Sequence, residues 1–181
     1  KGVGALAIRR GAPVVSQLVG GGQQWDIRSG TENVAGIVGF GMAAYLAREV
    51  LERDGWAAVA TRRDRLEQTL CASIPGTSVN GGGQPRLPNT MNLSFAHASG
   101  EALLQLLDEY EIMASSSSAC QSNVREPSHV LRAMGLAEPL LHGSLRMGLS
   151  ELNNDDEIDE VIARLPRLVE RSREAAVARV P

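Results

Sequence analysis

Two short segments of alternating hydrophobicity constrain the fold of this chain more than any other feature. In TMNLSF (90–95) and in GSLRMGLS (143–150), every second residue is apolar and the residues between are polar or small. Successive side chains of a strand point to opposite faces of a sheet. Each segment is therefore predicted to be a strand with one apolar face and one polar face.

Helical patterns surround these strands. Apolar residues recur at helical spacing over 34–51 and again over 56–74, and Gly55 between them permits either a kink or a continuous helix. Ser99 is placed to cap a further amphipathic helix. A long apolar stripe closes the chain, and Pro166 within it predicts a kink or a new turn of helix.

The remaining strand signals are short. GALAIRRG (4–11) predicts a strand followed by a turn, EIMASS (111–116) predicts a short strand, and the turn-rich segment 75–89 has room for one more. Because the strands are few and several connections are short, we expect an α+β fold in which helices cover one small sheet. A doubly wound parallel sheet is the less favoured alternative.

Composition limits the partners of the chain. Its 181 residues are 43% hydrophobic and 22% charged, with a net charge of -3. Aromatic residues make up only 3%, which leaves few stacking platforms for single-stranded nucleic acid. No basic block stands out, and no apolar run approaches the ~20 residues that a bilayer span needs. We therefore expect neither nucleic acid nor a membrane as a partner.

The two cysteines suggest a location and one candidate for chemistry. They lie far apart in sequence and form no disulfide framework, so a reducing cytoplasm is the simplest setting. No spacing of cysteines and histidines resembles a metal site. Cys71 falls within a helical pattern and is expected to be structural. Cys120 follows the run SSSSA (115–119), where a reachable thiolate and a buried small hydrophobe are both open interpretations.

Two further positions are candidates for binding. Arg146 lies on the polar face of its strand, where it either grips a carboxylate through paired hydrogen bonds or is an ordinary surface arginine. The loop RSGTEN (28–33) precedes a helix. It either binds a phosphate or simply caps that helix through Thr31 or Asn33.

Taken together, these segments resemble one family. SSSSACQSNVREPSHVLRAMGL looks like the catalytic loop of NifS/IscS-type cysteine desulfurases, which are related to class V aminotransferases. HGSLRMGLS, GGGQQWDIRSGTENV and KGVGAL resemble three other motifs of that family, in the same order and at matching spacing. The resemblance implies the aminotransferase-like fold of a fold type I enzyme that depends on pyridoxal phosphate (PLP).

The resemblance also implies residue roles. Such enzymes convert L-cysteine to L-alanine and pass the sulfur, held as a cysteine persulfide, to an acceptor or iron–sulfur scaffold protein during iron–sulfur cluster assembly. Cys120 matches the persulfide cysteine, and Arg146 matches the arginine that binds the substrate carboxylate. Thr31 matches a threonine that reaches the cofactor phosphate of the partner subunit in a homodimer. Arg28 lies in the same motif, and its cofactor role carries over less firmly.

The same resemblance predicts an incomplete site. The Schiff-base lysine of the family precedes the position of Lys1, so we expect this chain alone to be inactive. We expect residues 1–33 to be the end of the large PLP domain, 34–74 a connecting helical segment and 75–181 the small domain with the cysteine loop. Residues 1–33 are expected to show exposed apolar faces. The alternatives are a related class V enzyme, such as a selenocysteine lyase, and a non-catalytic module that binds a partner.

Overall fold

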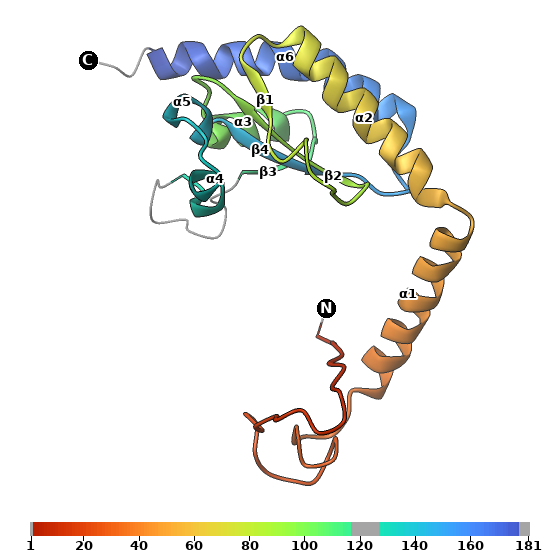
Figure 1. The fold of residues 1–181 in the computed structure, drawn as a ribbon. Helices are drawn as coiled ribbons and strands as arrows, with labels where there is room; N and C mark the ends of the chain where they lie inside the picture. The colour runs from red at the N-terminus through yellow and green to blue at the C-terminus, as the bar shows by residue number, and fades with distance from the viewer. Residues whose placement is uncertain (1, 117–126, 178–181) are drawn as a thin grey trace. The chain divides into compact units, whose positions relative to one another are not determined.

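The structure is a computed structural model, which describes residues 2–116 and 127–177. Within these ranges helices and a small sheet alternate along the chain (Figure 1). The elements, in order, are α1 (Val34–Glu52), α2 (Gly55–Ser73), β1 (Thr77–Val79), β2 (Thr90–Phe95), α3 (Gly100–Asp108), β3 (Ser115–Ser116), α4 (His129–Ala133), α5 (Glu138–Leu141), β4 (Ser144–Gly148) and α6 (Asp155–Val177). The expected α+β class is confirmed.

Packing divides the chain into two compact units, Lys1–Arg53 and Asp54–Pro181. The break falls where α1 gives way to α2, and Asp54 takes a left-handed backbone conformation there (φ 54°). Helix α2 thus packs with the sheet in the second unit. The predicted division of the chain at residues 33 and 74 stays a prediction.

The second unit is built on a four-stranded antiparallel sheet of order β1-β2-β4-β3. Its two central strands pair over five positions, with Met91 opposite Met147 and Leu93 opposite Leu145. Strand β3, predicted over 111–116, pairs with β4 at Ser115 and Ser116, the last residues described before 117. The two alternating segments of the sequence therefore lie side by side at the middle of the sheet.

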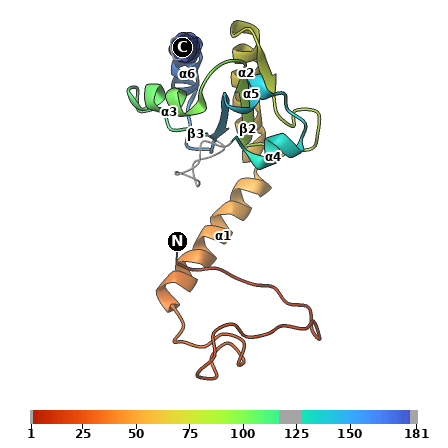
Figure 2. The ribbon, with the colours of Figure 1, turned by 90° about the vertical axis from the view of Figure 1, so that its left-hand side faces the viewer.

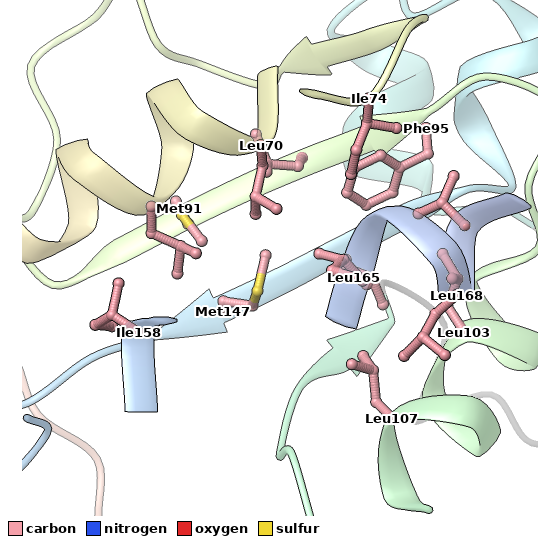
Figure 3. Packing of buried hydrophobic residues seen from close by; sticks show 14 of the residues in the cluster. Leu70, Ile74, Met91, Phe95, Leu103, Leu107, Met147, Ile158, Leu165 and Leu168 are labelled. Atoms are coloured by element: carbon pink, nitrogen blue, oxygen red, sulfur yellow. The ribbon is translucent and has the colours of Figure 1, made fainter. Parts of the chain in front are cut away.

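The apolar face of this sheet forms the core of the unit. Helices α2 and α6 lie side by side (Figure 1), and α3 lies beside α6 (Figure 2). Their apolar residues meet those of β2 and β4 (Figure 3), and the largest fully buried side chains include Phe95, Leu70, Leu103, Leu145 and Leu165. Helix α6 continues through Pro166 without a break in the helix.

Polar side chains cap α3 and hold α6 in place. Ser99 caps α3 as expected, because its side chain accepts a hydrogen bond from the Ala102 amide. The Ser172 hydroxyl of α6 accepts from the Ser99 amide (2.9 Å), and Arg173 donates to the carbonyls of Ala96 and Pro75. The C-terminal helix is thus anchored to two turns of the sheet by polar contacts as well as by its apolar stripe.

The first unit lacks the strand expected at its beginning. Residues 2–33 contain no strand, so the strand predicted for GALAIRRG is wrong, whereas the turn predicted after it is present at Arg10 and Gly11. A strand exists only with a neighbour to hydrogen-bond to, and the one bridge in this region joins Leu18 to Arg28. The expected exposure of apolar residues is observed, with Trp25 at 87% and Leu6 at 76%.

Helix α1 is also apolar and exposed. Among the described helices, it alone is long and apolar enough to span a bilayer, with a hydropathy of 1.5. The core helix of a larger protein meets the same test of length and composition. The finding therefore does not identify a membrane segment, and the expectation of no membrane partner remains a prediction.

The central strand pair should dominate the stability of the second unit. Leu93→Ala removes a side chain that is 0% exposed, so it should lower the free energy of unfolding by about 2–5 kcal/mol. The matched control Leu152→Ala changes a leucine that is 86% exposed and should shift it by no more than about 0.5 kcal/mol. Urea unfolding followed by circular dichroism measures both. Equal shifts would contradict the assignment of the buried face.

Candidate active site on the polar face of the sheet

The polar face of the sheet carries a row of side chains that crosses all four strands. Ser115 on β3 pairs with Arg146 on β4, and Arg146 pairs with Asn92 on β2. Asn80 follows β1 directly, and its backbone amide donates to the Asn92 carbonyl (2.9 Å). Directly paired residues share a face and lie roughly 5 Å apart, so these four side chains form a continuous row.

Arg146 is the cation of this row. It is exposed, while Leu145 and Met147 on either side of it in β4 are buried, as the sequence pattern predicted. The Arg146 side chain makes no hydrogen bond or ion pair with any residue in the described ranges. A guanidinium that is held by a strand and has no protein acceptor can bind an anion from solution, with a carboxylate as the geometric match.

The Asn92 side chain is held by Asn80, its neighbour on the side away from Arg146. The Nδ2 atom of Asn80 donates to Asn92 Oδ1 (2.6 Å) and to Ser94 Oγ (2.8 Å). The Asn80 Oδ1 atom is buried and finds no partner among the described residues. Burying an unpaired acceptor costs about 1–3 kcal/mol, so this arrangement is maintained by the rest of the fold.

One end of the polar face is covered, and the other is open. Ser94 and Ser144 pair across the two central strands and are fully buried, and α5 contacts β2 near them. Arg146 is exposed and Asn92 is half-buried. The accessible part of the face is therefore centred on Arg146 and Asn92.

The loop before α1 belongs to the first unit and is described by itself. Its polar groups mostly bond to one another: Ser29 Oγ donates to the Gly21 carbonyl, and Arg28 donates to the Ser29 carbonyl. Asn33 accepts from the Gly36 amide (3.0 Å) and is the cap of α1. Of the two capping residues proposed from sequence, the structure thus selects Asn33 and leaves Thr31 outside the helix.

Thr31 remains available for a ligand. Its side chain is exposed, and no described residue forms a hydrogen bond with it. A hydroxyl two residues before a helix cap suits one oxygen of a phosphate. Thr31 can therefore contact the phosphate of a cofactor. The described residues include no lysine that could bind a cofactor aldehyde, because the one lysine of the sequence is Lys1.

Of the two cysteines, the structure describes only Cys71. Cys120 lies outside the described residues, so its role is a prediction from sequence. Cys71 lies on α2, half-buried against the core, as expected for a structural cysteine. Burial raises the pKa of its thiol, and the nearby Glu67 carboxylate raises that pKa further.

A raised pKa makes Cys71 a poor nucleophile. At pH 7–8 the thiolate fraction of a thiol falls as its pKa rises, so Cys71 should be alkylated by iodoacetamide at least several-fold more slowly in the folded chain than in urea. The peptide that contains Cys71 can be followed by mass spectrometry, and the unfolded chain serves as the control. Equal rates in the two states would contradict the burial of this thiol.

The sequence pattern identifies Arg146 as a candidate binding residue but does not identify Asn92 and Asn80 beside it. Asn92 was visible as a polar residue of an alternating strand, and the pattern already placed it on the same kind of face as Arg146. Asn80 gave no signal, because it lies in a turn-rich segment. Its contact with Asn92 depends on the pairing of β1 with β2.

Comparisons with known proteins cover nearly the whole chain. A family model described as aminotransferase class-V matches residues 1–161. A cysteine desulfurase of Trichormus azollae is 52% identical over 174 residues, which are 96% of this chain and 43% of that protein. The chain thus spans less than half the length of this relative.

Two solved structures have the same fold. A structure titled NifS-like protein matches with a TM-score of 0.78 at 31% identity. The match covers 91% of this chain and 41% of that chain. The NifS-like protein of Rickettsia africae matches with a TM-score of 0.75 at 29% identity, over 86% of this chain and 40% of that chain.

Proposed function

The chain belongs to the class V aminotransferase family, and from this premise we propose that it is the C-terminal part of a PLP-dependent cysteine desulfurase. The observation that carries the proposal is the 52% identity to a cysteine desulfurase over 96% of the chain. That aligned share includes the region from the loop before α1 to strand β4. The Cys120 motif makes a desulfurase a better match than a selenocysteine lyase or a non-catalytic module.

In this proposal Arg146 binds the carboxylate of L-cysteine. The strand holds the backbone of Arg146 between two paired neighbours, and the exposed side chain at the open end of the polar face can reach the substrate. Two parallel hydrogen bonds would orient the amino acid and so point its thiol-bearing carbon in one direction. The group that binds the substrate is thus carried by a strand that is paired on both sides.

Cys120 would be the nucleophile. Its thiolate attacks the substrate sulfur, the carbon–sulfur bond breaks, and Cys120 keeps the sulfur as a persulfide while the carbon gains a proton to give L-alanine. Strand β3 lies beside β4, and Cys120 follows Ser116 by four residues. Four residues span at most about 14 Å, so the thiol is tethered within reach of a substrate held by Arg146.

The cofactor would be held mainly by residues that this chain does not contain. PLP, when bound, supplies the electron sink that makes the carbon–sulfur bond labile. From this chain, Thr31 would donate its free hydroxyl to the phosphate, across a homodimer interface, and Arg28 would lie next to it. We also propose a cytoplasmic location and a sulfur-acceptor protein as the partner that takes the persulfide sulfur.

The proposal is tested on the full-length protein loaded with PLP. Incubation with L-cysteine should yield L-alanine and a persulfide on the Cys120 peptide, and Cys120→Ser should lower alanine formation by roughly 100-fold or more because the oxygen cannot replace the thiolate. Cys71→Ser is the matched control and should retain activity. Persulfide on another cysteine, or full activity of Cys120→Ser, would refute the assignment.

Arg146 has its own prediction. Arg146→Gln keeps a polar side chain but removes the charge and the paired donors. It should raise the KM for L-cysteine by about 10- to 100-fold, since a hydrogen bond to a charged group contributes about 1.5–3 kcal/mol. Arg132→Gln, on the short helix α4, is the control for loss of one positive charge. Steady-state kinetics measures both, and an unchanged KM for Arg146→Gln would exclude the carboxylate role.

A further inference from the structure

The polar row contains a second donor beside Arg146. The Oδ1 atom of Asn92 is turned toward Asn80, which donates to it at 2.6 Å. Asn80 lies on the β1 side of Asn92, whereas Arg146 lies on the β4 side. Because the two terminal atoms of an amide point in different directions, the atom of Asn92 that faces Asn80 is not Nδ2, and the strand on the other side of Asn92 is β4 with Arg146.

The hydrogen bonds of Asn80 favour this orientation over its reverse. If both amides were rotated, Asn92 would donate to Asn80, and the amino group of Asn80 would occupy the buried place that its Oδ1 atom has now. In the observed orientation that place holds one acceptor without a donor, whereas the reverse orientation would put two N–H donors there, each of which needs an acceptor. Asn80 therefore sets which end of the Asn92 amide faces Arg146.

Donors without an acceptor then face the open end of the sheet. The Arg146 side chain has no hydrogen-bond or ion-pair partner within the described ranges, and the free end of the Asn92 amide also donates. A carboxylate has about four acceptor positions on its two oxygens, and a bidentate guanidinium uses two of them. One of the remaining positions is available to an amide on the neighbouring strand.

We propose that Asn92 donates a second hydrogen bond to the carboxylate bound by Arg146, and that Asn80 is the positioning residue that holds the Asn92 amide in its donating orientation. This inference rests on the proposed function, because it takes the ligand to be an amino acid. It assigns a specificity role to a residue pair outside the motifs that carry the family resemblance. The pair selects for a carboxylate rather than for the amine or the side chain of the ligand.

The test is equilibrium binding to the full-length, PLP-loaded protein, measured by calorimetry. The probes are L-alanine and ethylamine, which is the same molecule without its carboxylate. Asn92→Ala should weaken L-alanine binding by about tenfold or more and leave ethylamine binding unchanged. Thr90→Ala is the matched control. It lies two residues away on the same face of β2, loses one side-chain hydrogen bond to Asn89, and should bind both probes normally.

A second variant separates recognition from folding. Asn92→Asp keeps the oxygen that accepts from Asn80 but places a carboxylate beside Arg146, so it should weaken L-alanine binding at least as much as Asn92→Ala. Asn80→Asp removes the donor that orients Asn92 and should weaken L-alanine binding without affecting ethylamine. A purely structural role would leave the ratio of the two affinities unchanged in Asn92→Ala and in Asn80→Asp, and that result would overturn the inference.

The experiment distinguishes a failure of this inference from a failure of the proposed function. If the unaltered protein binds L-alanine but does not desulfurate L-cysteine, the proposed function falls while the Asn92 comparison still decides the inference. If the unaltered protein is an active desulfurase and Asn92→Asp binds L-alanine as tightly, the inference falls and the function stands. Binding that does not depend on the carboxylate in the unaltered protein would also overturn the inference.

Discussion

The pairing of β2 with β4 is the constraint on which the rest of the second unit depends. Its register places Leu93 opposite Leu145 on one face and Asn92 opposite Arg146 on the other. Side chains alternate with a period of two, so a slip of one residue would move every apolar side chain to the polar face. The same register that closes the core therefore also assembles the candidate site.

The two faces of the sheet are stabilised by different interactions. The apolar face gains free energy simply by leaving water, and helices α2, α3 and α6 cover it. The polar face has to find a partner for each buried group, and it does so only in part. Asn80 gives its amino group to Asn92 and Ser94 and leaves its own oxygen unpaired. Such a half-satisfied network persists where it orients a neighbouring group, which is the role inferred for Asn80.

Local patterns predicted the elements that contain their own signal. The alternation in TMNLSF and GSLRMGLS gave both central strands and the outward direction of Arg146, and Ser99 gave the start of α3. The failures depend on distant partners. GALAIRRG has the pattern of a strand, but no strand among the described residues pairs with it. Asn80 joins the polar row only because β1 pairs with β2.

The arrangement of the sheet also bears on the proposed desulfurase function, in which a protein holds a substrate and carries sulfur away. A group that orients a substrate has to be held in place, and Arg146 sits on a central strand between two paired neighbours. A thiol that delivers sulfur to a second protein has to reach both the substrate and that protein. Strand β3 lies one strand away from Arg146, and Cys120 follows its last described residue, Ser116, by four positions in the sequence. The sheet thus holds the backbone of the binding residue by pairing on both sides, and it places a residue close in sequence to the thiol on the neighbouring strand.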